Sequence, residues 1–151
     1  MLTKNGKVCL FWGMQNANSI FKKSDGTNLS INLGMTYQGT PYKTIFNNSI
    51  SLELGDGSTE PVESDLDLEN PITDLTELNS YNSYVEAAGS YDKNYIWFMT
   101  KTVRNDTSDP IIVSEIGIVS TYEGRILIAR DVISPVTIKP GEAYTFTMYI
   151  G

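Results

Sequence analysis

The chain has 151 residues, a length typical of one domain, with 18 acidic and 11 basic side chains and a net charge of −7. It contains no histidine and one cysteine, which excludes histidine-based catalytic triads, histidine-ligated zinc and internal disulfides within this chain. The acidic balance also argues against a nucleic-acid partner, because such a surface needs a basic stripe.

No apolar stretch of the sequence is long enough to cross a membrane as a helix. A spanning helix needs ~18 or more apolar residues, and the apolar run Val8–Trp12 is also too short for the core of a signal peptide. We therefore expect no membrane span and synthesis in a reducing cytoplasm. In that setting Cys9 is expected to be a small core residue.

Strands dominate the predicted elements. In chain order they are Lys7–Trp12, a weak strand near Leu29–Tyr37, Thr44–Leu54, and four strands between Tyr95 and Ile150. Alternation is clearest at the C-terminus, where Tyr144, Phe146, Met148 and Ile150 are separated by polar or aromatic residues. About seven strands at this spacing predict an all-β fold, an antiparallel β-sandwich of immunoglobulin-like or jelly-roll-like type. The last four strands form either a meander or part of a Greek key.

Two segments do not follow the strand pattern. Residues 13–42 are rich in Asn, Ser, Gly, Lys and Thr, and we expect a long loop or an extended N-terminal arm there. Residues 55–90 are expected to be an acidic loop with at most a short helix. Asp74 and Glu77 have capping-box spacing, and Leu75, Leu78 and Tyr81 would share one side of that helix. The whole of 1–151 is treated as a single domain.

Half of the acidic side chains lie in one stretch that contains no Lys or Arg. They are Glu53, Asp56, Glu60, Glu63, Asp65, Asp67, Glu69, Asp74 and Glu77. The stretch lacks the spacing of an EF-hand calcium loop, and nine acids make a glycosidase-like pair inevitable by chance. We expect a solvated acidic loop, with no catalytic residue, no metal site and no cofactor. A bound cation or an acid-dependent hydrolase are the alternatives.

Aromatic side chains form a second candidate feature. Trp12, Trp97 and Phe98 are expected in the sandwich core, where large aromatics dominate burial. Tyr81, Tyr84 and Tyr91, together with Trp97, are the candidates for a contact surface or a sugar-stacking surface.

Glu115 and Arg130 are charged residues within mostly apolar strands that are expected to form a hairpin. Neighbouring strands bring such residues within diagonal reach when the register places them on the same face. We expect a partly buried, structural ion pair.

Two stretches resemble small structural proteins of tailed bacteriophages. The first is Ile50-Ser-Leu-Glu-Leu-Gly-Asp-Gly-Ser-Thr-Glu-Pro61, followed by Ser64-Asp65 and Leu68–Ile72. The second contains Ser114–Ile118, Leu127–Val132 and Pro135–Glu142. Residues 1–49 lie outside the resemblance.

The resemblance implies a non-enzymatic part of a virion, in the tail, fibre, neck or capsid, with no catalytic residues. Its partners would be other virion proteins and further copies of itself as a homo-oligomer. The alternative is a receptor-binding module of a tail fibre or spike, which would use surface aromatics to bind a host-surface carbohydrate.

Overall fold

The structure is a computed structural model that describes residues 1–4, 18–32, 50–86, 95–121 and 124–150. All of its elements in these ranges are strands. They are β1 (Asn18–Lys22), β2 (Asn28–Asn32), β3 (Ile50–Gly55), β4 (Leu75–Glu86), β5 (Tyr95–Asn105), β6 (Ile111–Ser120), β7 (Ile126–Ile138) and β8 (Ala143–Ile150). The predicted strand Lys7–Trp12 lies outside the described residues.

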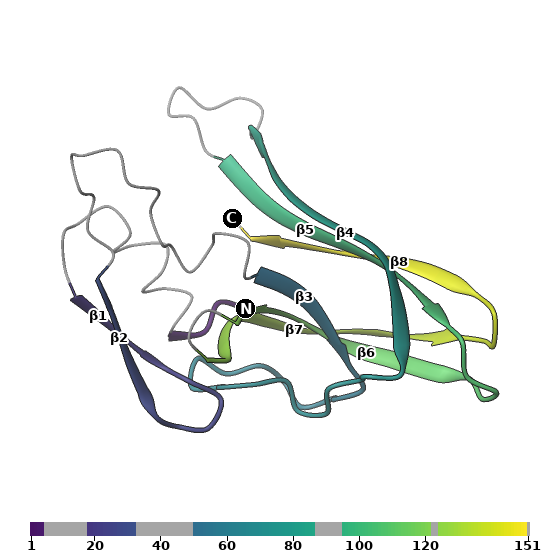
Figure 1. The fold of residues 1–151 in the computed structure, drawn as a ribbon, viewed down its shortest axis with the longest axis horizontal. Coiled ribbons are helices and arrows are strands. Elements are labelled where there is room, and N and C mark those ends of the chain that lie inside the picture. Colours follow the sequence, from purple (N-terminus) through teal and green to yellow (C-terminus); the bar gives the residue numbers. More distant parts are fainter. Residues whose placement is uncertain (5–17, 33–49, 87–94, 122–123, 151) are drawn as a thin grey trace.

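Two three-stranded antiparallel sheets form two layers (Figure 1). One has the strand order β3-β6-β7 and the other β4-β5-β8, and β1 and β2 form a separate hairpin. The connections β5–β6 and β7–β8 cross between the two sheets. Of the two arrangements expected for the last four strands, the meander is therefore wrong, because β5 pairs with β8 and β6 pairs with β7.

One hydrophobic core joins the two sheets. It takes Leu52 and Ile118 from one sheet and Met99 and Phe146 from the other, each at most 4% exposed. The alternation of side chains along a strand explains this placement, since the sequence neighbours of each of these residues point to the opposite face of its sheet. The arrangement is sandwich-like, in agreement with the predicted all-β antiparallel class.

The face of the β3-β6-β7 sheet that points away from this core is also covered. All residues from Val113 to Ser120 in β6 are buried. A second cluster of Leu68, Val119 and Leu127 lies on this outer face, where residues 56–74 cross the sheet. A strand covered on both sides has apolar residues on both faces, which accounts for the mostly apolar sequence of β6.

Residues 18–32 form a hairpin instead of the predicted loop or arm. Phe21 is fully buried and belongs to the shared core, while Ser24 N donates a hydrogen bond to Arg125 O at 2.8 Å. At the turn, Gly26 adopts a φ of 79°, which a residue without a side chain tolerates. The polar composition thus belongs to a hairpin that contributes one aromatic ring to the core.

The short helix expected near Asp74–Tyr81 is wrong, because Leu75–Glu86 is strand β4. A register shift between Glu77 and Asn79 leaves Leu78 as the extra residue of a β-bulge. Leu78 and Tyr81 are 48% and 51% exposed, so their helical spacing marks no buried face. No described helix is both long and apolar enough to cross a membrane.

Candidate functional site

Arg130 and Glu115 meet on the outer face of the β3-β6-β7 sheet. Arg130 in β7 stands opposite Gly117 in β6, which places Glu115 on the diagonal. Its Nε donates a hydrogen bond to Glu115 Oε1, and the two side chains are 4% and 0% exposed. The two residues expected to pair are thus brought together in a fully desolvated position.

Both members of the pair also hold the segment 56–74. Arg130 Nη1 donates to Asp65 Oδ2 at 2.8 Å, and Nη2 donates to Thr59 O at 3.0 Å. Glu115 accepts hydrogen bonds from Glu69 N at 2.9 and 3.1 Å. Burial opposes the charge of the guanidinium, but its hydrogen bonds to Glu115 and Asp65 raise the pKa of Arg130.

Two glycines make room for the Glu115 carboxylate. A Cβ at Gly57 would lie 2.7 Å from Glu115 Oε2, and a Cβ at Gly55 would lie 2.8 Å from Asn70 O as well as against the same carboxylate. Neither distance is tolerated by a real side chain. The two glycines of Gly55-Asp56-Gly57 therefore have a physical reason, which is close approach to a buried carboxylate.

A second arginine binds the same segment at Asp67, between the residues that Arg130 and Glu115 contact. Arg125 Nε donates to Asp67 Oδ2 at 2.7 Å, Nη2 donates to Asp67 Oδ1 at 2.6 Å, and Nη1 donates to Glu53 Oε1 at 2.7 Å. The bidentate bond to Asp67, against the effect of burial and with help from Glu53, raises the pKa of Arg125. We call Arg125 and Arg130, with Glu53, Asp65, Asp67, Glu69 and Glu115, the arginine clamp.

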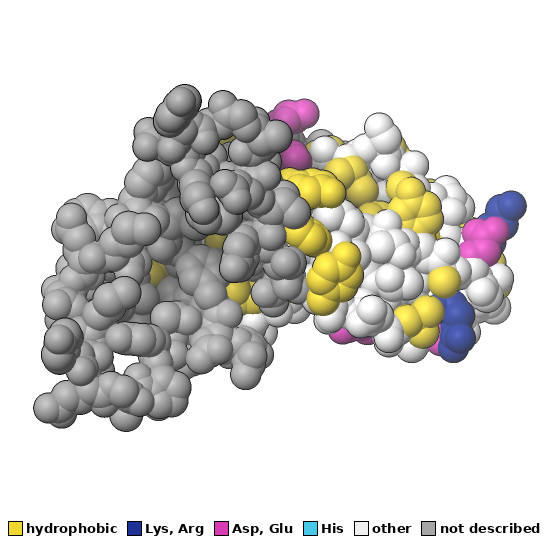
Figure 2. All heavy atoms as spheres, turned by 90° about the horizontal axis from the view of Figure 1, so that it is seen from above, with side chains coloured by type: hydrophobic (Ala, Val, Ile, Leu, Met, Phe, Trp, Pro, Cys, Tyr) yellow, Lys and Arg dark blue, Asp and Glu magenta, His cyan; other side chains and the backbone are white. Residues whose placement is uncertain are grey.

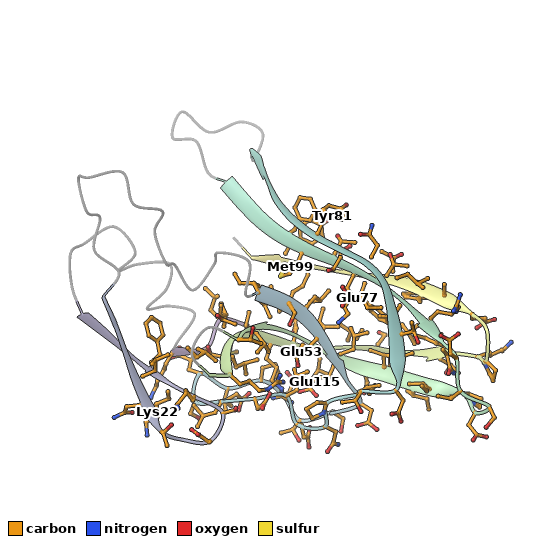
Figure 3. The ribbon with its side chains drawn as sticks, in the orientation of Figure 1. Lys22, Glu53, Glu77, Tyr81, Met99 and Glu115 are labelled. Carbon is orange, nitrogen blue, oxygen red and sulfur yellow. The ribbon has the colours of Figure 1, made fainter. Side chains whose placement is uncertain are left out.

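The clamp corrects the expectation of a solvated acidic loop. Four acids of that stretch (Glu53, Asp65, Asp67 and Glu69) bind an arginine, and their side chains are 20–38% exposed. Among the described residues, no three acidic or cysteine side chains are grouped to hold a metal ion. The contacts of the clamp therefore fix the irregular segment 56–74 to the β3-β6-β7 sheet. Figure 3 shows Glu53 and Glu115 in the layer of this sheet and Tyr81 in the layer of the β4-β5-β8 sheet.

The other sheet presents a row of aromatic rings on its outer face. The ring of Phe98 in β5 lies between those of Tyr81 in β4 and Tyr149 in β8, with centroids 5.9 and 5.7 Å away. The tyrosines are 51% and 65% exposed. The expectation that Phe98 lies in the core is wrong, because its neighbour Met99 takes the inward position and alternation turns Phe98 outward.

Threonine hydroxyls continue the same outer face beside the aromatic row. Thr100 pairs with Thr147 at 3.1 Å and Thr102 with Thr145 at 2.9 Å between β5 and β8. Figure 2 views the molecule from above and shows hydrophobic side chains among uncharged ones over this sheet, with most charged ones at one end. We call the two threonine pairs together with Tyr81, Phe98 and Tyr149 the aromatic face.

Only one of the four predicted surface aromatics can be placed on the aromatic face. Tyr81 is part of it. Tyr84 and Trp97 stand opposite each other in the β4–β5 register, but their side chains and all of Tyr91 lie outside the described residues. Sequence reasoning missed Tyr149, although the alternation of β8, with Met148 inward, is a signal that could have found it.

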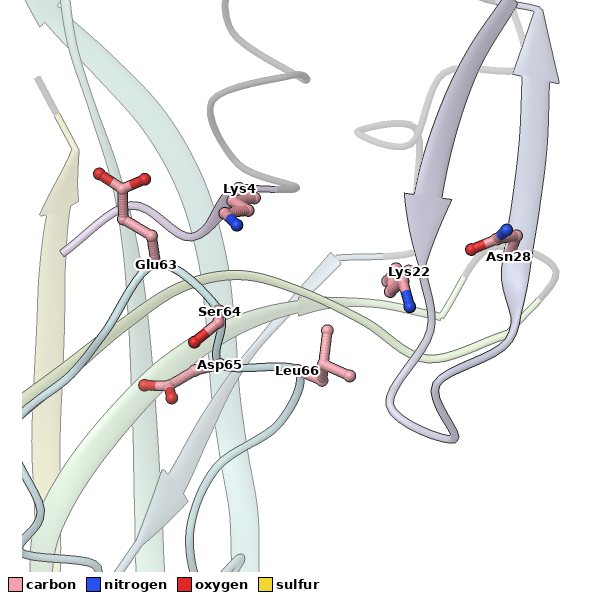
Figure 4. A pocket seen from close by; sticks show the side chains of 7 residues that line it. All are labelled: Lys4, Lys22, Asn28, Glu63, Ser64, Asp65 and Leu66. Carbon is pink, nitrogen blue, oxygen red and sulfur yellow. The ribbon is translucent and has the colours of Figure 1, made fainter.

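A pocket lies between the β1–β2 hairpin, Lys4 and residues 63–66 (Figure 4). Its lining includes Lys4 and Lys22 as well as Glu63 and Asp65. Asp65 is already bound to Arg130. Because charges of both signs line the pocket, it favours no particular class of ligand.

Comparison with known proteins found no matching family model, no matching curated protein and no matching solved structure.

Proposed function

We propose that the chain is a non-enzymatic structural component of a bacteriophage virion that works through protein–protein contacts. The observation that carries the contact role is the aromatic face, because Tyr81 and Tyr149 expose half or more of their surface on the outer face of a sheet. Aromatic residues of this kind are enriched where proteins bind one another. The assignment to a virion rests on the sequence resemblance to phage structural proteins.

The arginine clamp supports the same function. It holds residues 56–74 by charge-assisted hydrogen bonds, so the segment presents one fixed surface although it contains almost no regular structure. A preorganised surface loses less entropy on association than a flexible one. For the architecture we propose a β-sandwich of immunoglobulin-like or jelly-roll-like type, supported by the two sheets that share one core.

The virion assignment is tested on purified particles of a phage that encodes this chain. Quantitative mass spectrometry should find the chain in a fixed ratio to the major capsid protein, and that ratio should persist through density-gradient purification. Particles that lack the chain, from a host in which it is well expressed, would contradict the assignment.

A second candidate function is binding of host-surface carbohydrate by the aromatic face. Exposed tyrosine rings beside threonine hydroxyls offer both a stacking surface and hydrogen-bond partners for a sugar ring. On a glycan array, signals that disappear in Tyr149→Ala but persist in Tyr144→Ala would support it. Tyr144 is a fair control, since it is 44% exposed on the same strand but belongs to the opposite face. An array without signal would remove this candidate.

A further inference from the structure

The two sheets have four edge strands, and an edge strand with unpaired backbone groups can accept a strand from another molecule. The edges of the β3-β6-β7 sheet are occupied in part. Thr3 N donates to Ile128 O at 3.1 Å along β7, and Ile72 N donates to Leu54 O at 2.8 Å along β3. Further along β7, Pro135 has no N–H to donate. These two edges are poor sites for strand addition.

Strand β4, one edge of the other sheet, carries the devices that discourage strand addition. It contains the bulge between Glu77 and Asn79, and it bears a charged residue at Glu77. Bulges and charges both hinder pairing with a further strand.

Strand β8, the opposite edge, carries none of these devices. Ala143–Ile150 has the sequence AYTFTMYI, without a charged residue or a proline. Its register with β5 runs unbroken from Arg104↔Ala143 to Trp97↔Ile150. Within the described residues, β8 has β5 as its one strand partner. A regular, uncharged edge rich in β-forming residues is the type that extends a sheet.

We propose that β8 pairs antiparallel with β8 of a second copy of this chain across a two-fold axis, so that two sheets join into one of six strands. A second copy is the occupant that fits, because an uncharged edge is complementary to itself and a two-fold contact uses the same surface twice. This inference rests on the proposed function only in that the chain acts through protein contacts.

The side chains of β8 agree with self-pairing. Phe146 and Met148 are buried on the core side, while Thr145 and Thr147 point to the aromatic face. In an antiparallel pair whose axis passes through Phe146, Thr145 stands opposite Thr147 of the second copy. The core side of one sheet then adjoins the core side of the other. On the opposite face, the row of threonine pairs of one copy adjoins that of the second copy. The two aromatic faces become one surface.

Charge placed on the edge tests the pairing. We expect the wild-type chain to dimerise in sedimentation equilibrium over a concentration series, and the double variant Thr145→Lys/Thr147→Lys to raise the dimer Kd at least tenfold. Thr102→Lys is the matched control, because it disrupts the Thr102–Thr145 pair and adds charge to the same face from central strand β5. It should leave the Kd within a few-fold of the wild type.

Cysteine pairs provide a second test that does not depend on the lysine variants. In a Cys9→Ser background, Thr145→Cys/Thr147→Cys should give a disulfide-linked dimer on mild oxidation. Each single variant should not, because the axis through Phe146 brings residue 145 opposite residue 147. A linked dimer of Thr147→Cys alone would move the axis by one residue and still support edge pairing.

A wild-type chain that stays monomeric without cross-linking would overturn the inference, as would a dimer that tolerates charge at both threonines. These results are separate from the particle assay. A chain missing from particles but dimeric through β8 would remove only the virion assignment, and a monomer found in particles would remove only the β8 pairing.

Discussion

Arg130 and Glu115 lie where charge is costly, with side chains 4% and 0% exposed. Taking two ions out of water costs several kcal/mol each, and the cost is recovered only when geometry and further hydrogen bonds are good. Here Asp65, Thr59 O and the backbone N–H of Glu69 supply those bonds. Residues 56–74 therefore stabilise the buried ion pair, and the ion pair in turn holds residues 56–74 on the sheet.

Removing one partner should be strongly destabilising. We expect Arg130→Met to lower the free energy of unfolding by about 3–5 kcal/mol in urea denaturation, because Glu115 stays buried without its counter-charge. The double variant Arg130→Met/Glu115→Leu should recover part of that loss. Arg104→Met is the control at a half-exposed ion pair with Asp106, and its effect should be far smaller. An equal loss in both single variants would show that burial of the pair is unimportant.

Glu69 adds a pH dependence at the rim of the clamp. Hydrogen bonds from the backbone and side chain of Thr59 lower the pKa of Glu69 below the ordinary glutamate value of about 4.5. A lowered pKa in the folded state gives stability above pH 4.5 that is lost as the pH falls through the folded pKa.

Glu69→Gln tests that dependence. The free energy of unfolding should differ most between wild type and variant above pH 4.5, and the two curves should converge as the pH drops below it. Urea denaturation from pH 3 to 7 measures both. Glu60→Gln removes the same charge from the same segment and controls for net charge. A constant gap between wild type and Glu69→Gln at every pH would contradict the assigned linkage.

At the scale of the elements, Asn105 joins the two crossings between the sheets. Its Nδ2 donates to Asp109 O and to Ile138 O, both at 2.8 Å, and its Oδ1 accepts from Thr107 N at 2.9 Å. Its backbone N–H donates to Glu142 O at 3.0 Å. The side chain is fully buried, and these bonds tie the β5–β6 turn to the end of β7.

Asn105→Asp should therefore destabilise the fold although it changes one atom. The carboxylate cannot donate, so the carbonyls of Asp109 and Ile138, the second of them buried, lose their donor. We expect a loss of at least about 2 kcal/mol in urea denaturation at pH 7. Asn79→Asp, at an exposed position in β4, should stay within roughly 0.5 kcal/mol of wild type. Similar losses at both sites would mean that the hydrogen bonds of Asn105 contribute little.

Local pattern predicted the strands where alternation is regular and misled where it is broken. In β8, the alternation of Phe146 and Met148 with threonines marks the core side correctly. In β4, the bulge at Leu78 shifts the pattern by one residue, and Leu75, Leu78 and Tyr81 then take on helical spacing. A bulge depends on the partner strand, so a single sequence gives no sign of it.

The same limit applies to the arginine clamp. Charged residues within apolar strands indicated that Glu115 and Arg130 would pair. Their partners in residues 56–74 lie 46 to 71 positions away along the chain. Contacts over such separations follow from how the sheets pack, which local periodicity does not encode. From the sequence alone the acids of the loop were therefore predicted to be solvated, whereas in the fold four of them bind Arg125 or Arg130.

At the scale of the whole molecule, the two sheets share one core and should unfold together. Ile118 in β6 and Met99 in β5 belong to the same buried cluster, although their strands lie in different sheets. Because both sheets share this core, a cavity created by a substitution in one sheet should destabilise both sheets. Ile118→Ala should lower the free energy of unfolding by about 2–5 kcal/mol, because a fully buried side chain is truncated.

Hydrogen exchange measured by NMR shows in which strands Ile118→Ala lowers stability. The most protected amides of β5 should lose protection by the same amount as those of β6, since both open only through global unfolding. Ile112→Ala makes the same truncation on the same strand at a position 51% exposed, and it should change protection in neither sheet appreciably. If Ile118→Ala reduced protection in β6 while β5 kept its wild-type values, the sheets would be independent units. The aromatic face on one sheet and residues 56–74 on the other would then not be held rigidly relative to each other, as assembly through fixed contacts requires.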